Sequence, residues 1–311
     1  MRDGLGRVPS RVVGYAQVMS AATLWATLGL FYTGFIGVYN VPPLGVAFYR
    51  AFLGFAILFL ILAIGRPTWL RVTARDLPFF ALFGLVGVAA FFIIYVYAIH
   101  LTGMAVAVVL MYTAPAWVSL IAWRLFGEGL GRVKLMALGL AFGGCVLVAR
   151  ILDPAQVQLN LVGVLCGLGA GLTYGLYTVF NKLAVRRYSP WTVMLYALGF
   201  GAAFLLPLQS AAVFRPLRQP ALILWLLVLA IGPTLGAALL HTMSLRRLPA
   251  SVVSIVATLE PAIATVLAWL FLGERLGLDQ ILGSLLILAG VLLLQRADRE
   301  PCSVVEPAQG L

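Results

Sequence analysis

The sequence predicts an all-α integral membrane protein with ten transmembrane helices, arranged as two inverted repeats of five helices. Three observations support this prediction. First, the chain of 311 residues is 63% hydrophobic and 10% charged, whereas about a quarter of the residues of a soluble domain are charged. Second, its apolar runs are long enough to cross a bilayer, which takes about 20 residues per helix. Third, Pro, Trp, Gly and Glu residues recur at a constant offset along the chain.

Charges and turn-forming residues separate the apolar runs. The stretches YNVPP, HLTG and RRLPA, which begin at residues 39, 100 and 246, mark three of the closer joins. The predicted spans are 14–37, 43–64, 77–98, 104–124, 134–150, 161–184, 190–212, 221–243, 250–272 and 279–295.

Lysine and arginine predict the orientation, because cytoplasmic segments carry an excess of both. If the N-terminus is cytoplasmic, 16 of these residues lie in cytoplasmic segments and four lie in outer ones. We therefore expect both termini in the cytoplasm. The apolar run after the basic N-terminal stretch is longer than that of a signal peptide, so we interpret it as a retained span.

The second half of the chain repeats the first. Residues 104–147 align without a gap to residues 250–293, at an offset of 146. Pro-Ala, Ala-Trp and Gly-Glu pairs coincide in this alignment. Because each copy holds five spans, an odd number, the second copy enters the membrane from the opposite side. We expect a first repeat at 1–150, a second at 151–295 and a cytoplasmic tail at 296–311. Inverted repeats are typical of secondary transporters, whose substrate site lies near the midplane between them.

The pattern Pro-Ala, Ala-Trp, Gly-Glu-x-Leu at 115–130 and again at 261–276 resembles the EamA type of the drug/metabolite transporter superfamily. Trp25-Ala26 and Leu259-Glu260-Pro261 also look like that family. The resemblance implies export of small metabolites, often amino acids, across the cytoplasmic membrane, which is the inner membrane of the cell. It does not identify the substrate. One position departs from the pattern, since the first copy has Ala114 where the second has Glu260.

Two charges lie inside predicted spans, and each occurs in one repeat only. Glu260 is near the centre of its span, where an ionised carboxylate costs about 2.5 kcal/mol or more. It could bind a substrate amine or a coupled proton, or be a neutral carboxyl that hydrogen-bonds to the backbone. Arg50 could bind a substrate carboxylate or extend its side chain to the outer interface. An acid and a base at different depths could together hold a zwitterion.

Several aromatic residues are candidates for the wall of a central cavity, because such sites combine apolar walls with a few polar groups. Packing or lipid contact is the alternative for each one. The candidates are Trp25, Tyr97, Tyr112, Tyr174 and Tyr177. Tyr95 also lies in the third span.

Pro115 and Pro261 occupy equivalent positions in the two repeats and are candidate hinges for alternating access, or static kinks. His100 and His241 lie near predicted span ends, so we expect neither a metal site nor a proton relay there. Glu128 and Glu274 are expected to have structural roles near helix N-termini. Four glycines spaced four apart, from Gly163 to Gly175, predict close packing of the sixth span.

The sequence favours a secondary transporter with no cofactor and no bound metal. It lacks a phosphate-binding G-x-x-x-x-G-K-[ST] motif, and no cluster of residues suggests a membrane-embedded enzyme. The expected partners are a small-molecule substrate and the lipid bilayer, with no nucleic acid, and a monomer is compatible with the sequence. The alternatives are export of another metabolite or drug class (a nucleoside, a sugar derivative or a toxic amphiphile), an embedded enzyme, or a non-transporting scaffold.

Overall fold

The computed structural model describes residues 10–39, 41–151, 160–210, 213, 219–273 and 275–297. All the regular structure in these ranges is helical, so the predicted all-α class is confirmed. Glu274, Cys302 and most of the expected tail lie outside them. The α-helices are α1 (Ser10–Ala26), α2 (Leu28–Tyr39), α3 (Pro43–Gly65), α4 (Leu77–Phe83), α5 (Phe91–Met111), α6 (Ala114–Phe126), α7 (Arg132–Val148), α8 (Leu161–Ala184), α9 (Pro190–Leu205), α10 (Pro220–Leu229), α11 (Ala237–Ser244), α12 (Ala250–Ala257), α13 (Leu259–Leu272) and α14 (Leu278–Ala297).

Two short π-helical segments join α-helices into longer runs. Segment η3 (Gly84–Ala90) joins α4 to α5, and η7 (Ala230–Gly236) joins α10 to α11. The remaining short segments are the 3-10 turns η1 (Pro67–Leu70), η2 (Ala74–Asp76) and η5 (Leu206–Leu208).

Seven helical stretches in the described part of the chain are long and apolar enough to span a membrane, where the sequence predicted ten spans. The first predicted span is divided at Thr27 into α1 and α2, and α7 has only 17 residues. The third and fourth predicted spans form one run, Ala74–Phe126. Gly103 breaks this run with a φ of 80°, a conformation that glycine adopts readily.

The backbone irregularities recur at the offset predicted from the sequence. The π-helical segments η3 and η7 begin 146 positions apart. Gly127 and Gly273, also 146 positions apart, end α6 and α13 in the left-handed conformation, with φ of 67° and 69°. The two halves of the chain are therefore built alike in their deviations from ideal helices as well as in their motifs.

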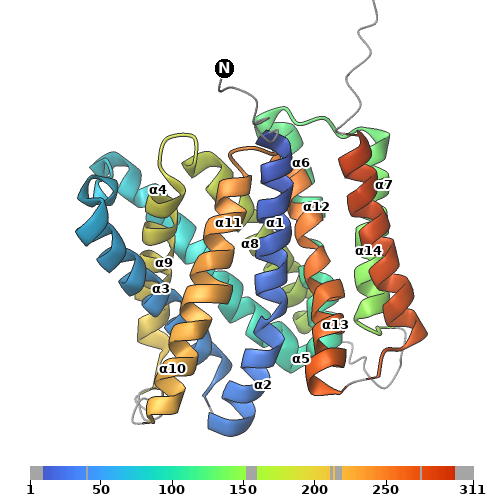
Figure 1. The fold of residues 1–311 in the computed structure, drawn as a ribbon, viewed down its shortest axis with the longest axis horizontal. Helices are drawn as coiled ribbons and strands as arrows, with labels where there is room; N and C mark the ends of the chain where they lie inside the picture. Colours follow the sequence, from blue (N-terminus) through green and yellow to red (C-terminus); the bar gives the residue numbers. More distant parts are fainter. Residues whose placement is uncertain are drawn as a thin grey trace, which may run out of the picture.

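Two pairs of corresponding helices pack against each other: α3 packs on α9, and α7 packs on α14. Helix α6, which corresponds to α13, packs on α12. Helix α1 packs against α11, α12 and α13 of the second half, and lies across the middle of the molecule (Figure 1). Helix α8 packs in turn against η3, α5 and α6 of the first half. Because each of these two helices packs against the other half, α1 and α8 lie at the junction of the two halves.

The predicted glycine ridge of α8 faces α5 and α6. A Cβ atom at any of its four glycines would come against α5, α6 or the turn between them. The prediction of close packing along this helix is thus confirmed.

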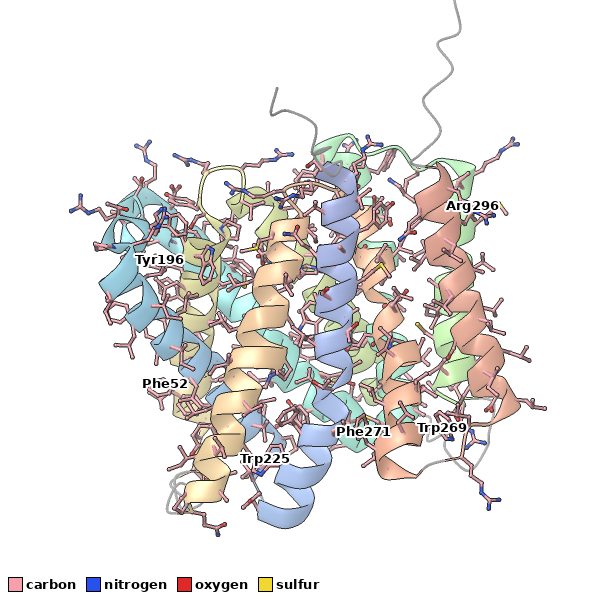
Figure 2. The ribbon with its side chains drawn as sticks, in the orientation of Figure 1. Phe52, Tyr196, Trp225, Trp269, Phe271 and Arg296 are labelled. Carbon is pink, nitrogen blue, oxygen red and sulfur yellow. The ribbon has the colours of Figure 1, made fainter. Side chains whose placement is uncertain are left out.

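The two ends of the molecule differ in their side chains. Helix α1 begins and α14 ends at the upper end in Figure 1. Figure 2 shows nitrogen-bearing side chains gathered at that end, where Arg296 lies, and Trp225, Trp269 and Phe271 toward the lower end. These three aromatic side chains are more than half exposed. Exposed aromatic residues near one end are typical of the interface between a membrane and water.

Candidate functional site

Glu260 lies where the predicted ninth span breaks. Helix α12 ends at Ala257, Thr258 forms the turn, and α13 begins at Leu259, so Glu260 and Pro261 are in the first turn of α13. The side chain of Glu260 is half-buried. A carboxylate in the first turn of a helix is favoured by the helix dipole, which offsets part of the cost of placing a charge in the membrane.

The carboxyl of Glu260 belongs to a group of polar side chains from both halves. Tyr112, in the turn after α5, interacts with it electrostatically. Tyr95 and Tyr174 interact with it electrostatically. Arg50 acts on the carboxyl from a greater distance, because the two side chains do not form an ion pair within 4 Å.

Arg50 is buried on α3, with 9% of its surface exposed. Its Nε donates to Thr234 Oγ1 in η7 at 3.1 Å, and one terminal nitrogen donates to the hydroxyl of Tyr32 at 3.4 Å. The guanidinium lies over the ring of Phe92, 5.2 Å from its centroid. The side chain is therefore held inside the protein, and the alternative that it extends to the outer interface is wrong.

An aromatic layer lies beside these two charges. The Trp25 ring is 5.3 Å from His241 and 6.3 Å from Tyr174, between ring centroids. Tyr177 stacks with Tyr174 at 6.4 Å and lies 5.7 Å from His241. These contacts bring together α1, α8 and α11, and Phe91 of α5 stacks on Tyr174 from the other side. The layer crosses the junction of the two halves.

His241 lies near the end of its helix, as expected, since the predicted span ended at 243 and α11 ends at Ser244. The structure nevertheless buries it to 1% exposure within the aromatic layer, and its Nδ1 has no hydrogen-bond partner among the described residues. The repeat itself contained a usable signal, since His241 stands 146 positions after Tyr95, another member of the site.

Tyr97 does not join this group. It is 57% exposed, while Tyr95 lies against Phe91 and interacts with Glu260. Residues two apart on a helix point in widely different directions, so only one of these two tyrosines can face the junction. The structure replaces Tyr97 by Tyr95 in the candidate site, and it brings the other predicted aromatic residues together.

Each of the two prolines marks a helix start rather than a kink within a helix. Pro115 lies in the first turn of α6, after a turn at Tyr112 and Thr113, and Pro261 lies in the first turn of α13, after Thr258. The first turn tolerates proline because its backbone N–H has no partner within the helix. The breaks are thus a few residues earlier than the prolines themselves.

Glu128 connects the two halves at the upper end. Its carboxylate accepts hydrogen bonds from the backbone N–H groups of Ala250, at 2.6 Å, and Ser251, at 3.1 Å, and from the hydroxyl of Ser251. Lys134 lies 3.9 Å from the same carboxylate. A structural role was expected, but the helix that Glu128 caps is α12 of the other half rather than its neighbour α7.

A small cavity of about 10 Å³ lies beside Tyr112 and His241. Ligand sites for drug-sized molecules measure about 300–1,000 Å³, so this arrangement of the helices is closed around the site. The cavity is lined by Tyr112, Ala114, Pro115, Val118, Tyr174, Thr178, His241, Ser254, Ala257 and Thr258.

A larger groove of about 460 Å³ lies between α3, α9 and α10, away from these groups. Its walls are almost wholly apolar, and the hydroxyl of Tyr49 in its lining already donates to the carbonyl of Val213 at 2.7 Å. The groove therefore offers a charged metabolite no binding group. In the described part of the chain, no set of three His, Cys, Asp or Glu side chains is placed to hold a metal ion.

Comparison with known proteins bears on the function. The EamA-like transporter family model matches residues 12–150 and 161–296. An uncharacterized transporter of Archaeoglobus fulgidus is 33% identical over 285 residues, covering 91% of this chain and 96% of the relative. A probable terminal-alkyne amino-acid exporter of Streptantibioticus cattleyicolor is 29% identical, covering 73% of this chain and 75% of the relative.

A solved crystal structure has a similar fold. It superposes with a TM-score of 0.76 at 20% sequence identity, covering 94% of this chain and 99% of the other. At this identity the likeness concerns the fold.

Proposed function

The chain belongs to the EamA-like transporter family and is a multi-pass membrane transporter rather than an enzyme; from this premise we propose that it exports small metabolites, foremost amino acids, through the junction of its two halves. The export is secondary, driven by an ion gradient or by the gradient of the substrate itself. The membrane is the cytoplasmic membrane, with both termini on its inner side.

One observation carries the proposal. Glu260 and Arg50 are opposite charges at the junction, they interact across a gap, and within the part of the chain that the structure describes neither has an ion-pair partner within 4 Å. A buried charge without a partner is costly, so each would gain from a ligand of opposite sign. A zwitterion provides both, because its ammonium group matches the carboxylate and its carboxylate matches the guanidinium.

The aromatic layer supports the same class of substrate. Trp25 and Tyr177 pack against Tyr174, and Tyr174 interacts with Glu260. Aromatic faces attract cations and pack against apolar side chains. The relative named as an amino-acid exporter is in keeping with this choice.

Transport requires the site to open, because a cavity of about 10 Å³ has no room for an amino acid. We propose alternating access, with bending at the two helix breaks that precede Pro115 and Pro261. The α12–α13 break carries Glu260 directly, so movement there would change the position of the carboxylate together with access to it.

Substrate counterflow in proteoliposomes tests the proposal. Liposomes containing the purified protein would be loaded with each unlabelled amino acid in turn. Entry of the same amino acid in labelled form would then be measured for the wild type, Glu260→Gln and Arg50→Gln. Asp279→Asn is the matched control, because Asp279 forms a partly exposed ion pair with Arg150 away from the site.

We expect saturable exchange in the wild type and in Asp279→Asn, with at least tenfold less in both site variants, since a lost charge-assisted hydrogen bond costs about 1.5–3 kcal/mol. Undiminished exchange in both site variants would show that these charges do not bind the substrate. Absence of exchange for every amino acid would redirect the search to nucleosides, sugar derivatives or toxic amphiphiles.

A further inference from the structure

The small cavity beside Glu260 has the features of a buried water site. Its volume of about 10 Å³ is close to the minimum that admits one water, and such a water needs two to four polar partners. Six of its lining residues carry polar side-chain atoms: Tyr112, Tyr174, Thr178, His241, Ser254 and Thr258.

His241 has an unused polar atom at this cavity. It lines the cavity, is 1% exposed, and its Nδ1 has no hydrogen-bond partner. A buried polar atom without a partner costs about 1–3 kcal/mol. A water in the cavity would satisfy this nitrogen, which accounts for a polar ring inside a layer of aromatic ones.

Two hydroxyl groups of the lining supply further partners. Ser254 donates its hydroxyl hydrogen to the carbonyl of Ser251 at 2.9 Å, and Thr258 donates to the carbonyl of Ile255 at 2.6 Å. Both oxygens keep lone pairs that accept hydrogen bonds. A water in the cavity would thus have acceptors in Ser254 of α12 and Thr258 of the turn after it, as well as in His241 of α11.

Tyr112 links the cavity to the carboxyl. It lines the cavity, and it also interacts electrostatically with Glu260. A phenol both donates and accepts a hydrogen bond, so it can pass a proton on without storing charge.

We propose that His241, a water in this cavity and Tyr112 form a proton relay to Glu260, which makes the proton the coupling ion of the transporter. In the loading direction, the His241 imidazolium releases the proton on Nδ1 to the water, the water gives a proton to the Tyr112 oxygen, and the Tyr112 hydroxyl gives its own proton to the Glu260 carboxylate. The products are neutral imidazole, an unchanged water, an unchanged phenol and a carboxylic acid. The reverse sequence unloads the carboxyl.

The groups facing His241 suit this role. They are Trp25 on α1, Tyr174 and Tyr177 on α8, Tyr112 in the turn after α5, Ser254 on α12 and Thr258 in the turn after α12. The charges that act on this layer are Glu260 and Arg50, one of each sign. None of the facing groups is a carboxylate that would trap the proton on the imidazole.

The relay rests on the proposed transport function, but its test needs no substrate. Infrared difference spectroscopy after a pH jump follows the carboxyl band that the wild type has and Glu260→Gln lacks. The rate at which this band responds would be compared for the wild type, Tyr112→Phe, His241→Gln and His241→Phe. His100→Gln is the matched control, because His100 is exposed.

We expect the response rate of the band to fall by a factor of about ten or more in Tyr112→Phe and in both His241 variants, since a positioned proton-transfer group contributes about 10²-fold or more to a rate. The rate in His100→Gln should equal that of the wild type. Tyr112→Phe removes a single oxygen and keeps the ring, so it guards against a failure to fold. A wild-type rate in Tyr112→Phe, or in a folded His241 variant, would overturn the relay.

Counterflow at equal pH separates this result from that of the proposed function. In His241→Gln, a loss of uptake driven by a pH gradient that exceeds the loss of exchange at equal pH supports the relay. Equal uptake with and without a pH gradient in the wild type would contradict proton coupling while leaving export of amino acids standing.

Discussion

Thr234 provides the shorter of the two hydrogen bonds that orient Arg50. Thr234 accepts the hydrogen bond from Arg50 Nε, and the threonine lies in η7, where the π-helical geometry changes the direction of the helix faces. Thr234→Val keeps the shape of the side chain and removes this acceptor. We expect the KM for transport to rise about tenfold, because hydrogen bonds to charged groups contribute about 1.5–3 kcal/mol.

Thr242→Val is the control for this change. Thr242 is also a buried threonine, but it bonds to Asn181 rather than to Arg50. Labelled-substrate kinetics should show an altered KM for Thr234→Val alone. Equal KM values for both variants would mean that Thr234 does not position the guanidinium.

For single residues, the sequence pointed to those candidate site residues that interrupt its hydrophobic runs and its repeat. Glu260 and Arg50 stand out because a charge inside an apolar run is expensive and because neither has a counterpart in the other repeat. Tyr95 and Tyr97 could not be separated, since both lie in a helix that is apolar on every side and has no detectable core face. His241 was missed because its position was judged by distance from a predicted helix end.

Among the elements, α12 has the most external support at its N-terminus. Glu128 caps it from the other half, and Lys182 of α8 donates to the carbonyls of Leu245 and Leu248, in the turn that leads to it, at 2.6 and 2.8 Å. The turn before α12 is thus attached to both α8 and the α6–α7 loop. Opening the molecule at this end would require these contacts to separate.

Removal of the cap should weaken the fold measurably. Glu128→Ala leaves the first N–H groups of α12 without an acceptor, at a cost of about 1–3 kcal/mol. We expect the Tm of the detergent-solubilised protein to fall by about 2–8 °C, and to fall less for Glu128→Gln, which keeps one acceptor oxygen. Asp279→Ala should have little effect, because exposed ion pairs contribute about 0–1 kcal/mol. A Tm for Glu128→Ala equal to that of Asp279→Ala would contradict the capping role.

The positions of most elements followed from hydropathy and turn signals, but their internal breaks did not. The division at Thr27 and the segment η3 contain no proline, and glycines occur throughout these helices. Segment η7 contains Pro233 inside the helix, and an interior proline removes a backbone hydrogen bond, so the sequence held a signal there that the span prediction did not use. The other breaks depend on packing between distant parts of the chain. Helix α1, for example, breaks where it meets α2, and it contacts four elements of the second half.

At the scale of the whole molecule, the repeat was the most informative feature of the sequence. It predicted two halves that are built alike, and in the structure α3 packs on its equivalent α9 and α7 on its equivalent α14. The same symmetry explains why both halves contribute residues to the candidate site. The two charges differ between the halves, since Arg50 belongs to the first half and Glu260 to the second. A symmetric scaffold with an asymmetric pair of charges can hold a substrate that has two different ends.

The inverted arrangement has a direct test in whole cells. Thr68 follows α3 and Ser210 follows α9, its counterpart, and both residues are exposed. If the repeats are inverted and the N-terminus is cytoplasmic, these two equivalent loops lie on opposite sides of the membrane. We expect a membrane-impermeant maleimide to label Ser210→Cys in intact cells and to label Thr68→Cys only after the cells are permeabilised, in a background where Cys145, Cys166 and Cys302 are replaced by alanine.

The reverse labelling pattern would keep the inversion and contradict the orientation, because the two loops would still differ. Labelling of both positions in intact cells would contradict the inversion itself. In that case α3 and α9 would end on the same side of the membrane. The two halves could then not exchange equivalent conformations, and this route to alternating access at Glu260 would be lost.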